Sequence, residues 1–230
     1  MDSIIYSHIL GCLVGGAIGD AFGAAVETAE AERLRQITGG DWISEFLATR
    51  GDDNLHYLGQ WEPDAPRGTS TDDTRLNQAF VECAVRHEGH VTADALARDY
   101  ISRYRRPADF YPRHPDFAAQ QYFGLFRLSC AYLGVAEEPD RAVVSMAELQ
   151  GNARTDLYGL ISLAPAGLLY ANHPEAAYRF AFDLDVFDVG YARDATAVDP
   201  EKPLFLTPAL PRSRTQGCEG KKEASFWTQK

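Results

Sequence analysis

The chain has 230 residues, of which 45% are apolar and 24% charged, so it is long enough to bury the core of one large globular domain. Its formal net charge of −11 excludes nucleic acid as a default partner, because binding to phosphates needs a basic surface. We therefore expect no strong nucleic-acid binding.

The first apolar segment, residues 9–26, raises the question of a membrane span. It contains Asp20 and is rich in Gly and Ala rather than Leu, so we expect a soluble helix over residues 4–26 and no membrane partner. Glycines recur in it at intervals of four, which places them on one side of the helix: Gly11, Gly15, Gly19 and Gly23. Glycine is a poor helix former, so this pattern predicts a close approach by another backbone.

The rest of the chain also has helical periodicity, and long alternating runs typical of strands are absent. We therefore predict an all-α fold. After the first helix, the helices expected in chain order cover residues 28–38, 74–87, 93–104, 117–133, 139–149, 157–171 and 174–183.

Composition changes near residue 198. Residues 199–230 hold four of the twelve prolines, six Lys or Arg and four Asp or Glu, and show no helical period after Leu206. This composition predicts a divergent, disordered tail after a folded domain of residues 1–198.

The cysteines predict a compartment. Four are present, at positions 12, 83, 130 and 218, and no two form a CxxC pair, so we expect reduced thiols in a reducing compartment. The chain begins Met1-Asp2-Ser3 without a basic region, which does not fit a secretory signal. The expected location is the cytoplasm.

The strongest local motif is Thr71-Asp72-Asp73-Thr74, directly before an apolar helix. Two adjacent carboxylates with flanking hydroxyls offer the hard oxygen ligands that Mg²⁺, Mn²⁺ and Ca²⁺ prefer. The alternative is purely structural, since Thr caps helices and acidic residues favour the first helical turn. The motif alone leaves both interpretations open.

A second motif, in the first helix, favours the metal-binding interpretation. The small-residue helix holds Gly19-Asp20-Ala21-Phe22-Gly23 and is followed by Glu27, which resembles the opening signature of the ADP-ribosylglycohydrolase family. In that family a Thr-Asp-Asp-Thr run follows a few dozen residues later, as it does here. Ala164-Pro165-Ala166-Gly167 is similar to an Ala-Pro-x-Gly helix in the middle of the family's proteins. The resemblance covers roughly residues 4–197.

The resemblance implies a compact orthogonal helical bundle and a centre of two Mg²⁺ or Mn²⁺ ions. Thr71, Asp72 and Asp73 would supply its N-terminal ligands, and Asp72 would also be catalytic. Glu27 matches a position near the scissile bond in some branches of the family, where it would act as general base, although a solvated charge past a helix end is an equal alternative. For Asp20 we expect a structural role, accepting hydrogen bonds from neighbouring helix ends.

The chain also departs from the family pattern. The second acidic motif, Gly-Gly-Asp-x-Asp-Thr, is absent: Asp183-Leu184-Asp185 and Asp194-Ala195-Thr196 are both incomplete. The second ligand set of the metal centre is therefore missing, and we expect a C-terminally incomplete domain from a truncated gene model, a splice form or a degenerate copy. Gly151 and Asn152 resemble a substrate-contacting Asn-Gly loop of the family, but they lie earlier relative to Pro165.

The implied activity is metal-dependent hydrolysis of the glycosidic bond of ADP-ribose, attached to a protein or carried by a small molecule. A catalytically impaired ADP-ribose-binding protein is the alternative that the missing motif favours, and a purely structural helical protein is a third. The expected state is a monomer.

Overall fold

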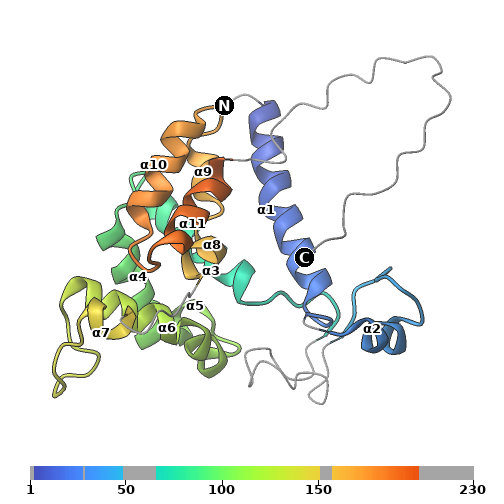
Figure 1. The fold of residues 1–230 in the computed structure, drawn as a ribbon, viewed down its shortest axis with the longest axis horizontal. Coiled ribbons are helices and arrows are strands. Elements are labelled where there is room, and N and C mark those ends of the chain that lie inside the picture. The colour runs from blue at the N-terminus through green and yellow to red at the C-terminus, as the bar shows by residue number, and fades with distance from the viewer. Residues whose placement is uncertain (1–2, 28, 49–65, 151–156, 202–230) are drawn as a thin grey trace, which may run out of the picture.

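The computed structural model describes residues 3–27, 29–48, 66–150 and 157–201, and every regular element in these ranges is a helix (Figure 1). The predicted all-α fold is therefore confirmed. Figure 1 labels the helices as α1 Ser3–Gly23, α2 Ala31–Thr38, α3 Asp72–Arg86, α4 Ala93–Arg105, α5 Pro107–Phe110, α6 Pro115–Leu133, α7 Met146–Gln150, α8 Tyr158–Ser162, α9 Ala166–Leu169, α10 Pro174–Leu184 and α11 Tyr191–Glu201.

The core lies between α3, α4, α6, α8, α10 and α11. Leu76 and Phe80 of α3 pack there with Leu96 and Tyr100 of α4, and all four side chains are at most 1% exposed. Apolar residues spaced three and four apart give α3 and α4 the buried faces that the sequence predicts. Thr71 and Thr92 cap the two helices, and each side chain accepts a hydrogen bond from a backbone N–H of the first turn.

A buried arginine joins three of these helices. Arg103 of α4 is 1% exposed; it donates to Asp99 at 2.7 Å and to Glu82 of α3 at 2.6 Å. Its remaining nitrogen donates to the hydroxyl of Tyr111 at 3.3 Å, and Tyr111 shares a hydrogen bond with Tyr122 of α6. Two carboxylates and a hydroxyl thus compensate the buried charge, which would otherwise be strongly destabilising.

Helix α1 lies apart from this core (Figure 1). It packs mainly on α3, and many of its large apolar side chains are at least 38% exposed: Ile4, Ile5, Tyr6, Leu10, Val14 and Ile18. By length and composition alone its residues Ile4–Gly23 could cross a membrane. When only one helix near the N-terminus passes this test, the result is weak evidence for a membrane span, because core helices and signal sequences pass it too. The predicted close approach to the glycine ridge is wrong within the described residues, because no atom there comes within 4 Å of a Cβ built on any of the four glycines.

Two predicted helices are wrong in extent. Residues 139–149 contain only α7, because Ser145 and Glu148 form a capping box that begins the helix at Met146: the Ser145 backbone N–H donates to Glu148 at 2.7 Å and the Glu148 N–H donates to Ser145 at 3.3 Å. Residues 157–171 form two short helices, α8 and α9. Pro165 has no N–H to continue the first of them.

Two helices are absent from the prediction, the four-residue α5 and the longer α11. α11 follows Gly190, which has a positive φ of 58°, and its buried face is made of small side chains: Ala192, Thr196 and Ala197. Small residues give a weak hydrophobic pattern, so the periodicity missed this helix. It ends at Glu201, three residues beyond the predicted domain boundary at residue 198.

A glycine contact tests the packing of α8. A Cβ on Gly159 would lie 2.3 Å from a carboxylate oxygen of the buried Asp185, whereas a Cβ on Gly11 of α1 would meet nothing within 4 Å. We expect Gly159→Ala to lower the free energy of unfolding by about 1–3 kcal/mol through overpacking. Gly11→Ala should raise it by about 0.5–1 kcal/mol, because alanine favours the helix.

Urea unfolding followed by circular dichroism measures both changes. A loss of stability in Gly11→Ala as large as that in Gly159→Ala would contradict the open position of the glycine ridge.

Candidate functional site

The site is built where the C-terminal end of α1 meets the first turn of α3. Asp20 of α1 accepts hydrogen bonds from both threonines that flank the two aspartates of the motif. The backbone N–H and hydroxyl of Thr71 donate at 2.8 and 2.5 Å, and those of Thr74 donate at 3.2 and 2.5 Å. The structural role expected of Asp20 is therefore confirmed.

These bonds also explain why the motif begins a helix here. The first backbone N–H groups of a helix have no partner inside it, and a negative charge near them is stabilising. Asp20 satisfies the N–H of Thr74, and the Thr71 hydroxyl accepts from the N–H of Asp73 at 3.3 Å. Thr71 is 2% exposed, so its hydroxyl is held in place by burial as well as by bonding. The capping interpretation of the motif is thus correct for Thr71.

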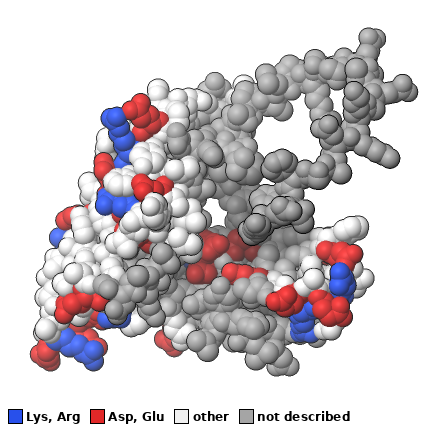
Figure 2. All heavy atoms as spheres, viewed as in Figure 1, with Lys and Arg blue, Asp and Glu red and all other residues white. Residues whose placement is uncertain are grey.

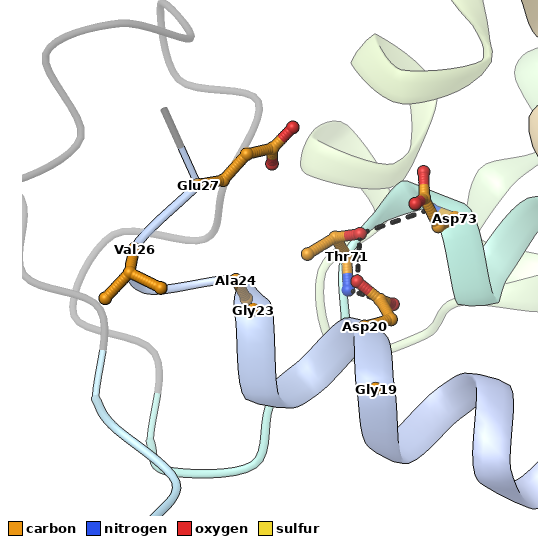
Figure 3. A pocket seen from close by; sticks show the side chains of 8 residues that line it. All are labelled: Gly19, Asp20, Gly23, Ala24, Val26, Glu27, Thr71 and Asp73. Carbon is orange, nitrogen blue, oxygen red and sulfur yellow. Dashed lines mark hydrogen bonds between the residues drawn. The ribbon is translucent and has the colours of Figure 1, made fainter. Parts of the chain in front are cut away.

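A pocket of about 430 Å³ opens beside this junction (Figure 3). Its walls come from the end of α1, the turn after it and the start of α3, and it is lined by Gly19, Asp20, Gly23, Ala24, Val26, Glu27, Thr71 and Asp73. Glu27 approaches from the turn and Asp73 from α3 (Figure 3). In Figure 2 acidic side chains gather in the hollow at the middle of the molecular face. We call the pocket lined by these eight residues the acid pocket.

Burial and the repulsion of nearby carboxylates raise the pKa of two side chains in the acid pocket, Asp73 and Glu27. Partial burial, and then repulsion by Asp72, Asp20 and Glu27, raises the pKa of Asp73 to about 6. Burial, then Asp72 and Asp20, also raises the pKa of Glu27. The Asp73 side chain is exposed to solvent, so a cation can reach it. The positive charge of a bound cation would remove the part of the pKa shift that comes from repulsion by the neighbouring carboxylates.

Asp72 lies beside the acid pocket but is not one of the residues that line it. Burial, more than any other cause, raises its pKa, and the nearby charge of Arg75 opposes that rise. Of the predicted metal ligands, the structure therefore places Thr71 and Asp73 on the pocket wall and Asp72 next to it. Gly151 and Asn152, the predicted substrate contacts, lie outside the described residues.

The oxygen ligands at this junction have the right chemistry for a divalent cation, but their arrangement does not form a complete site. Carboxylate and hydroxyl oxygens with a local excess of negative charge are what Mg²⁺ and Mn²⁺ bind. Among the described residues, however, no three Asp, Glu, His or Cys side chains form a group arranged to hold a metal. Both oxygens of Asp20 are already occupied by the threonines. The junction therefore offers one incomplete ligand set.

Two buried acids lie elsewhere and were not predicted as a pair. Asp185 and Asp188 are at most 4% exposed, and Asp188 accepts hydrogen bonds from the backbone N–H groups of Tyr158 and Gly159 at 3.2 and 2.8 Å. Burial, then repulsion by Asp185, raises the pKa of Asp188. Asp188 therefore holds the start of α8 to the α10–α11 corner. Asp185, which belongs to the incomplete Asp183-Leu184-Asp185 sequence, accepts a hydrogen bond from the Asp188 backbone N–H at 3.1 Å.

Asp73→Asn tests the repulsion in the acid pocket. A carboxyl whose pKa is raised in the folded state binds more protons there than in the unfolded chain, so its ionisation costs stability as pH rises through about 6. We expect Asp73→Asn to raise the melting temperature at pH 7 and the gain to shrink toward pH 4.

Asp116→Asn, which changes a first-turn aspartate of α6 outside the pocket, is the control for the loss of a charge near a helix start. Millimolar Mg²⁺ should raise the melting temperature of the parent chain more than that of Asp73→Asn. A stability gain in Asp73→Asn that does not change between pH 4 and pH 7 would contradict the account.

Comparisons with known proteins give the family. A family model described as ADP-ribosylglycohydrolase matches residues 1–197 of the 230 residues. A search of curated proteins found no match, and a search of solved structures found none. The matched range includes α1, the acid pocket and the whole packed core. The chain therefore belongs to the ADP-ribosylglycohydrolase family.

Proposed function

We propose that this chain is a hydrolase that acts on ADP-ribosylated proteins or on small molecules that contain ADP-ribose. The observation that carries the proposal is the acid pocket, where Asp20, Glu27 and Asp73 line one cavity beside the capped start of α3. Membership of the ADP-ribosylglycohydrolase family supports the reaction class.

We further propose that one Mg²⁺ or Mn²⁺ ion is bound by Thr71, Asp72 and Asp73, in place of the two ions expected from the family. All the walls of the acid pocket belong to α1, the turn after it and the start of α3, and three ligands leave such an ion incompletely coordinated. Weak binding, in the millimolar range, follows from the missing ligands. Thr71, Asp72 and Asp73 would hold the ion, and its chemistry there would be charge stabilisation and easier deprotonation of water.

Glu27 is the general base in this proposal. The raised pKa of Glu27 lies closer to neutral pH than that of an ordinary carboxyl group, and a base takes a proton from water most effectively when its pKa is near the working pH. The water oxygen would form a bond to C1″ of the ribose, the glycosidic bond would break, and Glu27 would accept the proton that water loses. The leaving acceptor would then take up a proton, so the products are free ADP-ribose and the unmodified acceptor.

A second pocket supports a ligand that carries both phosphate and a planar base. It has a volume of about 260 Å³ and is lined by Arg75, Phe110, Tyr111, Pro112, Arg113, His114, Phe117 and Ala118. The guanidinium of Arg75 lies 5.4 Å from the centre of the Phe117 ring and donates to Gln121 at 2.9 Å. A cationic and aromatic wall near the start of α3 suits the ADP portion of the substrate.

The second candidate function is binding of ADP-ribose without turnover. The observation that favours it is the incomplete ligand set, since the described residues hold no group arranged to grip a metal ion. We also propose a monomer in a reducing, cytoplasmic compartment, where buried thiols such as those of Cys83 and Cys130 stay reduced.

Release of ADP-ribose from an ADP-ribosylated protein mixture, with Mg²⁺ and with a chelator, tests the hydrolase. We expect metal-dependent release by the purified chain that falls about 10²–10⁴-fold in Glu27→Gln, because a general base contributes a factor of that size. Asp72→Ala should also abolish the metal-dependent release of ADP-ribose. Asp116→Asn, which also removes a first-turn aspartate but lies outside the pocket, is the matched control and should keep the parent rate.

Two other outcomes are informative. Release that is insensitive to the chelator would contradict a metal-assisted reaction. Metal-dependent binding of ADP-ribose by calorimetry, without any release, would replace the hydrolase by the second candidate.

A further inference from the structure

An apolar groove runs along α1 and has no role in the proposed reaction. It has a volume of about 640 Å³ and lies between α1, α3 and the segment that joins α8 to α9. Its lining residues are Cys12, Leu13, Gly15, Gly16, Ala17, Gly19, Asp20, Asp73, Thr74, Asn77, Gln78, Val81, Ala164, Pro165 and Leu168. It meets the acid pocket at Gly19, Asp20 and Asp73, which line both.

The groove wall suits an apolar occupant. Among its lining residues only Asp20 and Asp73 are charged, and both lie at the end that meets the acid pocket. Asn77 on the groove wall has a buried side-chain oxygen without a hydrogen-bond partner among the described residues. Backbone N–H groups of an extended segment are the donors that such a wall accepts.

We propose that residues 204–210 of this same chain, Leu-Phe-Leu-Thr-Pro-Ala-Leu, occupy the groove. We call them the apolar tail segment. Five of the seven residues are apolar, and prolines at 203, 208 and 211 exclude a continuous helix, so the segment would lie extended. Seven extended residues reach about 23 Å, which is longer than the stretch of α1 on the groove wall, residues 12–20, at about 14 Å.

The chain leaves the packed core at a suitable place. α11 ends at Glu201 and packs against α9, and Leu168 of α9 is part of the groove wall. In the view of Figure 1, α11 ends on the side of α9 nearest α1. Only Lys202 and Pro203 separate Glu201 from the apolar tail segment, a reach of about 10 Å, so little loop entropy opposes the contact.

The opposite charges of the tail and of the acid pocket also favour this contact. Residues 202–230 contain six Lys or Arg and two Glu, whereas the whole chain has a net charge of −11. The groove opens into the acid pocket, where the carboxylates of Asp20, Glu27 and Asp73 lie. A basic tail leaving the groove at that end would reduce the repulsion among them, which a neutral partner would not do.

Cross-linking in the full chain tests the contact. Cys12 lines the groove, Cys83 and Cys130 are fully buried, and Cys218→Ser removes the remaining thiol. With Thr207→Cys in that background, a short bis-maleimide should join residues 12 and 207 within one chain. The matched control moves the acceptor thiol to the other face of α1 by Cys12→Ser with Val14→Cys, since Val14 is 47% exposed and outside the groove.

We expect the intramolecular yield to be at least about tenfold higher at residue 12 than at residue 14. Leu204→Asp with Leu206→Asp should reduce it by at least about tenfold, because burial of each leucine is worth more than that factor. Circular dichroism of each variant shows that the helices remain.

Three outcomes would overturn the proposal. Equal yields at residues 12 and 14, or a yield that the two aspartates leave unchanged, would show that the tail does not occupy the groove. Cross-linked dimers would assign the groove to a second copy. Equal yields at residues 12 and 14 in water, together with protection of the α1 amides from hydrogen exchange by neutral lipid vesicles, would assign α1 to a membrane.

Discussion

The carboxylate of Asp20 is the interaction on which the site depends. It is the one charge on α1, and it accepts four hydrogen bonds from Thr71 and Thr74, so it attaches a largely exposed helix to the packed core. The same bonds fix where α3 begins, which places Asp73 on the pocket wall and Asp72 beside it. Without this contact Glu27, in the turn after α1, would have no fixed position relative to the aspartates. Charge repulsion in the acid pocket is the cost of bringing these groups together.

Much of the core follows from local sequence pattern. Threonine caps and apolar positions three and four apart were sufficient to predict α3 and α4, and the Gly19-Asp20 and Thr71–Thr74 motifs pointed to the junction that the structure shows. A glycine at position 159 gave no such signal, because its reason is a carboxylate 26 residues away that leaves no room for a Cβ. The buried Arg103 could have been noticed, since it lies three residues after Tyr100 on the apolar face of α4.

The glycines of α1 show why a pattern can predict a contact that is not there. Spacing places them on one side of a helix, but a close approach also requires a partner element, and none lies near them in the described residues. The same gap leaves an apolar groove open beside the acid pocket. The proposed tail contact therefore rests on the same open side of α1 that the glycines leave.

The central claim is that Asp20 arranges the acid pocket for a divalent cation, and nuclear magnetic resonance of the Asp73 and Glu27 carboxyl groups tests it most directly. Titration with Mg²⁺ should shift both signals in the parent chain at millimolar concentration. In Asp20→Asn, which keeps the shape but removes part of the acceptor set, we expect the apparent affinity to fall by about tenfold or more while the helices remain. An identical Mg²⁺ response in the two proteins, or no response in either, would contradict the account.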